Sequence, residues 1–384
     1  MPASAGRPGE ALRETAQVKF GVMFQLSVPR PWTRESERTV INNALEQVKL
    51  ADELGFDYAW STEHHFLEEY SHSSCPEMFL TACAMTTKRI RLGHGIVVCV
   101  PQYSSPIRIA ERTAMLDILS GGRLEVGTGR SATWTELAGM GADFETTKQT
   151  WDEFVRVIPK MWTQERFAYQ GQFFSMPERA VLPKPYQQPH PPMWVAVTSP
   201  GTEVDAAERG LGSLGLSFGT LKDQERVIAN YRRIIRSCEP VGSFVNEHVA
   251  TVSFMYCHED DATALKTGAI LSAGFRPLAA QFVHPPEALP TKPSHVQGLL
   301  SSLRQGDGPP PREGTTIGDP QHIVRELKRY ESIGVDTMNL LLNVAECVPQ
   351  EEVLKSLRLF AKEVIPHFQS GQSGAAKPAL ASAQ

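Results

Sequence analysis

The sequence contains no closely spaced cysteine pair, no excess of basic residues and no long apolar run. Its six cysteines are scattered, so neither a zinc ribbon nor a disulfide framework is indicated. The formal net charge of −5 argues against a general nucleic-acid binder, which has to neutralise phosphates. No apolar run approaches the roughly 20 residues that cross a bilayer, and the N-terminal region contains no apolar signal segment. We expect a cytoplasmic protein that binds neither nucleic acid nor membranes.

The chain is long enough to build a large core. It has 384 residues, of which 41% are hydrophobic. Residues 1–16 and 369–384 are small, polar and rich in Pro, Ala or Ser, which predicts loose ends. Residues 17–368 are expected to form a single domain.

Eight short apolar runs, followed by helical patterns, fill this domain. Strands that are buried on both faces and joined by helices pair in parallel, with right-handed crossovers. Eight such units favour a closed (β/α)8 TIM barrel with insertions over the alternative of an open, doubly wound sheet. The expected strands begin at Lys19, Phe56, Ile90, Arg123, Pro192, Ser213, Val249 and Thr337. The expected helices span roughly 36–54, 76–87, 106–119, 146–163, 202–210, 221–237, 261–272, 320–333 and 350–366.

Two insertions interrupt the alternation. Residues 164–190 predict a small hairpin that ends in a Pro-rich run, between the fourth helix and the fifth strand. Residues 275–316 form a long Pro/Gly-rich excursion inside the seventh unit. Loops of this length in compact domains are either functional lids or disordered segments, and both interpretations remain open.

The segment STEHHF places Glu63, His64 and His65 at the end of the second strand, where a TIM barrel carries its catalytic groups. A metal site is not expected, because adjacent strand residues point to opposite faces and no further ligands have a suitable spacing. Two interpretations remain. The histidines serve only the structure, or they line a polar pocket in which an imidazole is an acid, a base or a hydrogen-bond donor. The position at a strand end favours the pocket.

A second group of residues predicts an anion site. VTSPGTEVDAAERG opens a helix, whose free N–H groups and dipole attract anions. The residues in question are Thr198, Ser199, Gly201 and Thr202. A capping turn without a ligand would have a similar sequence. Arg130, at the end of the neighbouring strand with Gly129 before it, favours the anion site and a phosphorylated cofactor or substrate.

Two further strand ends belong to the same expected face. Gly95 interrupts the β-branched third strand, and a glycine there marks a bulge or a close approach of the backbone to a flat ligand. Ser217 and Phe218 lie at the end of the sixth strand. A simple bulge at Gly95 remains as good an explanation as a ligand.

In order and spacing, these segments resemble bacterial luciferase and the wider family of flavin-dependent luciferase-like monooxygenases. The resemblance covers nearly the whole barrel, from KFGVMF to SLRLFAKEVIPHF. Its most specific segments are GFDYAWSTEHHF, IRLGHGIVV, LDILSGGRLEVGTGR, VAVTSPGTEVDAAERGLGSLGLSF and GDPQHIVRELKRYESIGVD.

The resemblance implies a TIM barrel that binds reduced FMN from a separate flavin reductase and reacts it with O₂ to a C4a-hydroperoxide. The implied substrate is a small hydrophobic or carbonyl-containing molecule. His64 falls on the family's catalytic histidine, with His65 and Glu63 beside it. The implied flavin contacts are Gly95, Ile96, Gly129, Arg130, Thr198, Ser199, Gly201, Thr202, Ser217 and Phe218. A non-prolyl cis peptide is expected near Gly95 and Ile96.

Two positions depart from luciferase. Thr198 replaces a carboxylate of its phosphate site, and Gly129 replaces the cysteine beside its flavin. The second change predicts oxygenation without efficient light emission. The expected apolar enclosure of the pocket consists of Phe24, Trp60, Phe66 and Phe218.

Two other functions remain open. The wider superfamily includes enzymes that transfer hydride with the deazaflavin F420, and their phosphate site would look alike. A non-catalytic flavin-binding subunit is the other alternative, against which both histidines and Arg130 argue. Family members pair through the helices after the second and third strands, so a homodimer is expected, with a heterodimer possible. The expected seam consists of Phe79, Leu80, Cys83 and Ala84, which core packing explains equally well.

Overall fold

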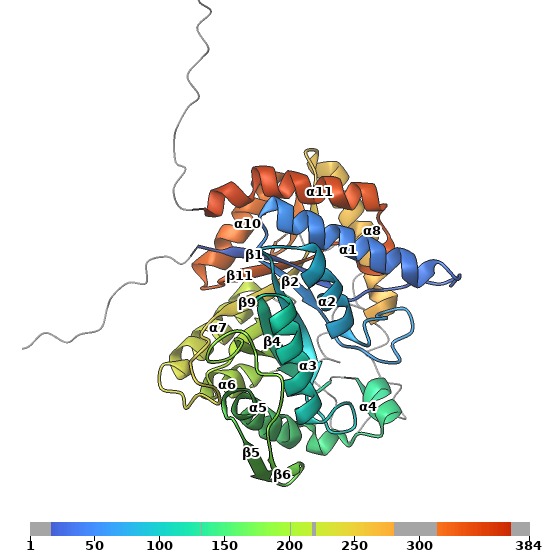
Figure 1. The fold of residues 1–384 in the computed structure, drawn as a ribbon. Helices are drawn as coiled ribbons and strands as arrows, with labels where there is room; N and C mark the ends of the chain where they lie inside the picture. The colour runs from blue at the N-terminus through green and yellow to red at the C-terminus, as the bar shows by residue number, and fades with distance from the viewer. Residues whose placement is uncertain (1–16, 132, 200, 217–219, 280–312, 370–384) are drawn as a thin grey trace, which may run out of the picture.

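The computed structural model describes residues 17–131, 133–199, 201–216, 220–279 and 313–369. Within them, eight parallel strands close a barrel (Figure 1). In their order around the barrel they are β1 (Lys19–Phe24), β2 (Tyr58–Ser61), β3 (Arg91–Val98), β4 (Leu124–Gly129), β7 (Met193–Val197), β8 (Gly212–Gly215), β9 (Val249–Cys257) and β11 (Thr337–Leu341). Gly21 of β1 is paired with Tyr58 of β2 on one side and with Asn339 of β11 on the other, which closes the ring. The predicted barrel is confirmed, and the open-sheet alternative is wrong.

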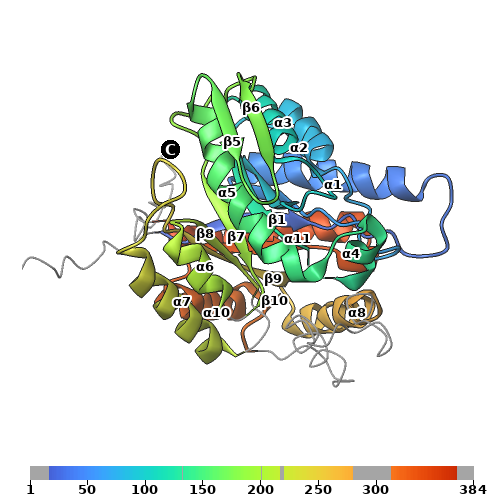
Figure 2. The same cartoon turned by 90° about the horizontal axis from the view of Figure 1, so that it is seen from below.

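Helices surround the barrel on its outside (Figure 2). They are α1 (Ser36–Leu54), α2 (Pro76–Thr86), α3 (Pro106–Leu119), α5 (Thr147–Thr163), α6 (Thr202–Glu208), α7 (Leu221–Ile235), α8 (Asp261–Ala279), α10 (Pro320–Ser332) and α11 (Gln350–Glu363). Their ends follow local chemistry. Helix α1 stops at Gly55, whose φ of 95° is a left-handed conformation that glycine adopts without strain. Helix α3 begins after Ser105, whose side chain accepts a hydrogen bond from the N–H of Ile107.

The insertion at 164–190 contains the predicted hairpin. Strands β5 (Phe167–Gln170) and β6 (Ser175–Arg179) pair antiparallel. The hairpin packs on α5, where the Glu153 carboxylate accepts hydrogen bonds from the N–H groups of Phe173 and Phe174. It therefore lies outside the barrel and leaves the strand ends open.

The described residues differ from the expectations in three elements. Helix α4 (Trp134–Met140) was not predicted, because seven residues are too few to show a helical period. Helix α8 extends to Ala279, into a segment that was expected to be irregular. Strand β10 (Thr316–Gly318) adds to the edge of β9. The remainder of the expected excursion, residues 280–312, lies outside the described residues.

Glu125 closes the N-terminal end of the barrel. Its carboxylate accepts hydrogen bonds from the Nε of Arg91 and, at 2.7 Å, from the Nε1 of Trp194. Trp194 stands edge-on to Trp60, with ring centroids 5.5 Å apart. Burial raises the pKa of Glu125, and the charge of Arg91 counteracts part of this effect. Because these side chains fill the N-terminal end of the barrel, the open space lies at the carboxyl ends of the strands.

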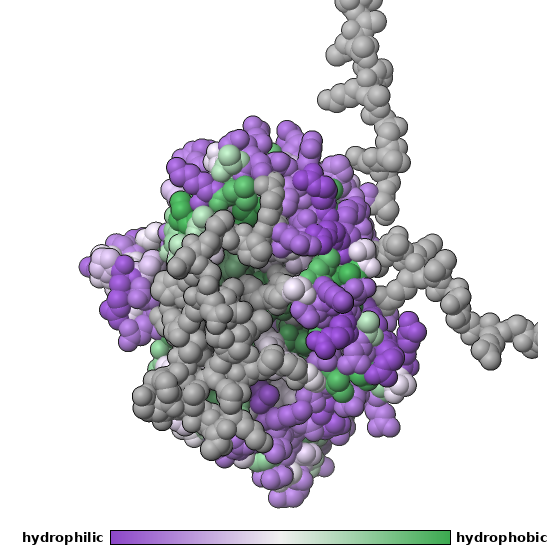
Figure 3. All heavy atoms as spheres, turned by 180° about the vertical axis from the view of Figure 1, so that it is seen from behind, coloured by the Kyte–Doolittle hydropathy of each residue, from purple (hydrophilic) through white to green (hydrophobic). Residues whose placement is uncertain are grey.

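The outer surface combines hydrophilic and apolar areas. On the face opposite to that in Figure 1, hydrophobic residues gather toward the middle and hydrophilic residues surround them (Figure 3). Elsewhere, α2 and α3 expose several large apolar side chains. They are Met78, Met85, Met115, Ile118 and Leu119. None of the helices in the described ranges has both the length and the apolar character that a membrane span needs.

Candidate active site

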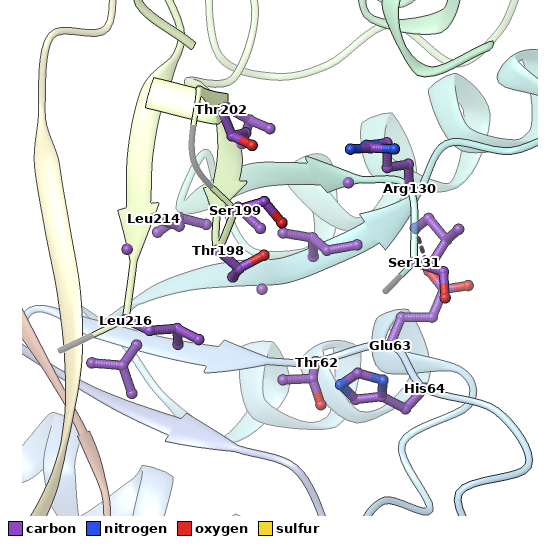
Figure 4. Close-up of a pocket in the computed structure, with 18 of the residues that line it drawn as sticks. Thr62, Glu63, His64, Arg130, Ser131, Thr198, Ser199, Thr202, Leu214 and Leu216 are labelled. Carbon is purple, nitrogen blue, oxygen red and sulfur yellow. Dashed lines mark hydrogen bonds between the residues drawn. The ribbon is translucent and has the colours of Figure 1, made fainter. Parts of the chain in front are cut away.

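A cavity of about 390 Å³ opens at the carboxyl ends of the barrel strands. Its size lies in the range of small-molecule sites, roughly 300–1,000 Å³. Figure 4 shows Glu63 and His64 on one side of it and Thr198, Ser199 and Thr202 on another, from different strand ends. The predicted site residues in its wall are Glu63, His64, Gly95, Ile96, Gly129, Arg130, Thr198, Ser199 and Thr202.

His64 is held by a carboxylate from another element. Glu136, on α4, has its Oε1 3.1 Å from the Nδ1 of His64, and the same oxygen accepts the N–H of His65 at 3.0 Å. The hydroxyls of Thr133 and Ser131 donate to its other oxygen, at 2.6 and 3.2 Å. Burial would raise the pKa of Glu136, but the charge of His64 and these hydrogen bonds outweigh burial and lower it.

This contact decides the tautomer of His64. An ionised carboxylate can only accept hydrogen bonds, so the Nδ1 of His64 carries the proton. In the neutral ring, Nε2 is then the acceptor nitrogen. Sequence reasoning missed Glu136 because it lies in a segment expected to be a loop. Thr133 and Glu136 have the spacing of a capping box, which was the sequence signal that could have predicted a helix beginning here.

His65 has a different carboxylate partner. Its Nε2 lies 3.3 Å from the Oε1 of Glu63, and its ring stands edge-on to Tyr103. The second oxygen of Glu63 accepts the N–H of Val98 at 2.8 Å. His65 therefore lies behind Glu63 and is not among the residues of the cavity wall. In the described part of the chain, no group of three or more His, Cys, Asp or Glu residues could hold a metal ion.

Arg130 and three hydroxyls form a group of hydrogen-bond donors at one end of the cavity. The Nη1 of Arg130 donates to the Oγ1 of Thr147 at 3.2 Å. Within the described ranges, no carboxylate pairs with Arg130. Among the described residues of the cavity wall, the hydroxyls of Thr198, Ser199 and Thr202 have no hydrogen-bond partner. Burial lowers the pKa of Arg130, and Asp205 counteracts this. Helix α6 has only seven residues, so an anion at this end of the cavity would have to be bound by side chains rather than by a helix dipole.

Lys148 adds a cation that sequence reasoning missed, since no motif surrounds it. It lies on α5 in the cavity wall, and its Nζ is 2.8 Å from the carboxylate of Asp205. Arg209 also approaches Asp205, at 3.5 Å. Since Asp205 already has two cationic partners, it does not neutralise Arg130, and this end of the cavity stays positively charged.

Gly95 and Ile96 lie in a β-bulge. The register between β3 and β4 shifts between His94 and Val97. The cis peptide bonds of the described residues all precede prolines, so the expected cis peptide near Gly95 is wrong. A Cβ atom at Gly95 would lie 2.9 Å from the Cε of Met23, and one at Gly129 would lie 2.7 Å from the Cδ1 of Ile96. A side chain at either position would have to displace the end of the Met23 or Ile96 side chain.

Of the remaining predicted flavin contacts, one described residue, Gly201, is not in the cavity wall. Gly201 is exposed and forms the left-handed turn before α6, with a φ of 85°. Ser217 and Phe218 lie outside the described residues.

The apolar enclosure differs in part from the expected one. Trp60 lines the cavity as expected. Phe24 instead packs on Phe79 of α2, because strand residues alternate between the two faces, and Phe66 is exposed at the surface. The aromatic side chains that line the cavity besides Trp60 are Tyr70, Phe144, Trp151 and Phe275.

Comparison with known proteins identifies the family. A sequence profile described as luciferase-like monooxygenase matches residues 18–337, which is most of the chain. The chain belongs to the luciferase-like monooxygenases. The resemblance inferred from the motifs is thereby confirmed, and the protein is an oxidoreductase of this flavin-dependent family.

Similar proteins support this luciferase-like monooxygenase assignment. Over 351 residues, this chain is 24% identical to the oxygenase component of a flavin-dependent trigonelline monooxygenase from Acinetobacter baylyi. The alignment covers 88% of this chain and 93% of the relative. The crystal structure of monooxygenase RslO1 from Streptomyces bottropensis superposes with a TM-score of 0.75 at 26% identity, covering 92% of this chain and all of the other.

Two solved structures of lower identity share the fold and differ in cofactor. A type II Baeyer-Villiger monooxygenase from Pseudomonas putida in complex with FMN has a TM-score of 0.72 at 17% identity, covering 91% of this chain and 98% of the other. A coenzyme F420 dependent tetrahydromethanopterin reductase from Methanopyrus kandleri has a TM-score of 0.66 at 20% identity, covering 92% of this chain and 100% of the other. The fold alone therefore does not choose between the two cofactors.

Proposed function

We propose that this protein is the oxygenase component of a two-component system, in which reduced FMN and O₂ oxygenate a small hydrophobic or carbonyl-containing molecule. The observation that carries this proposal is the donor group of Arg130 and three hydroxyls at one end of the cavity, in which no described carboxylate pairs with Arg130. It lies across from a histidine whose tautomer Glu136 determines. An anionic cofactor and a proton-accepting group can thus face the same enclosed space.

The donors fit the phosphate of FMN. Arg130 and Lys148 supply charge, and the hydroxyls of Thr198, Ser199 and Thr202 supply hydrogen bonds. The rest of the wall fits a flat ring, because it is aromatic or aliphatic and tight at the Gly95 bulge. When bound there, reduced FMN would supply the two electrons that activate O₂.

His64 is the residue that we propose exchanges a proton with the reacting oxygen. Its Nδ1–H donates to Glu136, so its Nε2 is the nitrogen that can take up a proton. Tyr70 stands edge-on to the imidazole, with ring centroids 5.3 Å apart, and keeps the ring from turning. The surrounding aromatic wall would exclude water from the reacting atoms and favour an apolar substrate.

Replacing Glu136 by Gln should slow product formation about tenfold, because a charge-assisted hydrogen bond exceeds a neutral one by roughly 1–1.5 kcal/mol. The measurement is the single-turnover rate with reduced FMN, compared with the rate of the Glu153→Gln variant. Glu153 is also a carboxylate that bonds backbone N–H groups, but it lies under the β5–β6 hairpin. Equal rates for the two variants would contradict the positioning role of Glu136.

Titration under anaerobic conditions separates FMN from F420. The proposal predicts that reduced FMN binds tightly and that reduced F420 binds at least tenfold more weakly. Tighter binding of F420 would favour the hydride-transfer alternative. FMN reduced chemically and FMN reduced by a flavin reductase should both support turnover, since the reductase is proposed as a supplier only.

A cytoplasmic location belongs to the same proposal, because all six cysteines are free.

A homodimer through α2 and α3 is also part of the proposal. The expected seam residues are not available for it, because Phe79, Leu80, Cys83 and Ala84 are buried in the core. The exposed methionines Met78, Met85 and Met115, with Ile118 and Leu119, offer an apolar surface on the same two helices. A second copy could pair with this surface through twofold symmetry.

Replacing Met115 by Asp should shift the protein from dimer to monomer in analytical ultracentrifugation, because a charge would be buried at the seam. Ile270→Asp on α8 is the matched control, since Ile270 is 46% exposed and Met115 is 48% exposed. A native protein that sediments as a monomer, or a Met115 variant that remains a dimer, would contradict the α2–α3 seam.

A further inference from the structure

A second, smaller cavity adjoins the active-site cavity. It has a volume of about 30 Å³ and lies between the end of β1, α1 and the segment after β11. The two cavities share the wall residues Met23, Gln25 and Leu341. A buried water needs roughly 10–15 Å³ of such space and two to four polar partners, so about two waters fit.

Gln25 lies between the two cavities. Its Nε2 donates to the hydroxyl of Tyr70 at 2.6 Å, and its Oε1 is buried without a hydrogen-bond partner. Tyr70 is the residue that packs on the imidazole of His64. Buried polar atoms without partners are uncommon in native proteins, and an ordered water is a frequent explanation. The small cavity provides the space for such a water next to Gln25.

Glu346 is the charged residue in the described wall of the small cavity. Its position depends on an unusual backbone, since Ala345 and Glu346 both have positive φ angles, 69° and 50°. Residues other than glycine rarely adopt this backbone conformation, and those that do are concentrated at functional sites. The Nδ2 of Asn343 lies 3.5 Å from the carboxylate, and the residue is only partly buried. Glu346 therefore borders both the small cavity and the surface.

We propose that the small cavity is a hydrated passage through which water and protons move between the active site and Glu346. Waters in the passage would join the Oε1 of Gln25 to the carboxyl group of Glu346. The use of the passage rests on the proposed function. Oxygenation with reduced flavin and O₂ yields the oxygenated product, oxidised flavin and one water. That water contains one oxygen atom of O₂ and the two hydrogens lost by the reduced flavin, and it has to leave an apolar cavity.

The surroundings of Glu346 allow it to exchange protons near neutral pH. Burial raises its pKa to about 7, although a hydrogen bond from Asn43 of α1 acts in the opposite direction. Burial also raises the pKa of the neighbouring Cys347 thiol, which stays protonated in this range. On α1, Glu46 lies one turn after Asn43, and its carboxylate accepts a hydrogen bond from Gln350 of α11 at 2.9 Å.

A crystal structure of the protein should show ordered waters between Gln25 and Glu346. A dry cavity at a resolution that reveals other buried waters would overturn the proposal. This measurement does not depend on catalysis, so it can fail while the proposed oxygenase function stands, and the reverse also holds.

Thermal unfolding of the Glu346→Gln variant tests the titration. The folded pKa lies above the ordinary value of 4.5, so ionisation opposes folding, and stability falls as the pH rises from about 4.5 to about 7. The variant cannot ionise there. Its Tm should therefore exceed that of the native protein more at about pH 8 than at about pH 5.

The matched control is Glu326→Gln on α10, which removes another buried carboxylate, one that accepts the N–H of Gly314. A Tm difference for Glu346→Gln that is equal at both pH values would overturn the role of Glu346. In the functional arm, the rate at which O₂ reoxidises the reduced-FMN complex should lose its pH dependence near pH 7 in this variant only. Retention of that dependence would also overturn the proposal.

Discussion

Replacing His64 by Ala should lower the rate of product formation by about 10²–10⁴-fold, which is the usual contribution of a general acid or base. The reason is that the Nε2 of His64 is the proton acceptor selected by the contact between Nδ1 and Glu136. Binding of reduced FMN should remain within about twofold of the native value, because the imidazole lies away from the Arg130 donors (Figure 4). The measurement is single-turnover product formation, together with an anaerobic titration.

His72→Ala is the control for this experiment. His72 is partly buried, and its Nε2 lies 2.6 Å from the backbone oxygen of Glu68, outside the cavity wall. This variant should keep the native rate. Unchanged product formation in His64→Ala would remove His64 from the mechanism. A parallel loss of FMN binding would instead assign it a role in holding the cofactor.

Replacing Arg130 by Ala should raise the Kd for reduced FMN by about 10–150-fold, because hydrogen bonds to charged groups contribute roughly 1.5–3 kcal/mol. Arg130 has no carboxylate partner among the described residues, so its loss leaves no buried anion behind. The folded state should therefore survive, and the effect should appear in binding. Anaerobic fluorescence titration measures it.

Riboflavin makes the Arg130 experiment specific, because it lacks the phosphate. Its affinity should be the same for the native protein and the variant. Arg156→Ala on α5 is the control for arginine removal, since Arg156 pairs with Asp152 at an exposed position. An equal loss of affinity for FMN and riboflavin would contradict a phosphate site at Arg130.

Periodicity was enough to predict the barrel. Strands such as β3 and β4 are buried on both faces, and helices such as α1 carry apolar stripes that end at glycine, so local pattern and global fold agree. Helix α4 also ends at a glycine, Gly141, but it is too short to show an apolar stripe. Its position depends on Glu136, which bonds His64 and His65 across 72 and 71 residues of sequence. Contacts of that kind have no local signal beyond a cap.

The candidate site was predictable where strand ends decide it. His64, Arg130 and Thr198 follow three different strands, and parallel strands bring their ends to one face of the barrel. Lys148 could not be predicted, because it reaches the cavity from a helix surface, where lysine is ordinary. The predicted apolar enclosure was wrong at Phe24 and Phe66. At Phe24, a difference of one residue along the strand places the side chain on the opposite face. At Phe66, the backbone adopts a left-handed conformation.

The most direct test of the oxygenase function is to mix the anaerobic complex of the protein and reduced FMN rapidly with O₂ and record absorbance spectra. An oxygenase of this kind should form a transient species whose spectrum differs from those of reduced and oxidised FMN, and whose decay coincides with product formation when substrate is present. Reoxidation at the rate of free FMN, without such a species, would contradict the proposed oxygenase function.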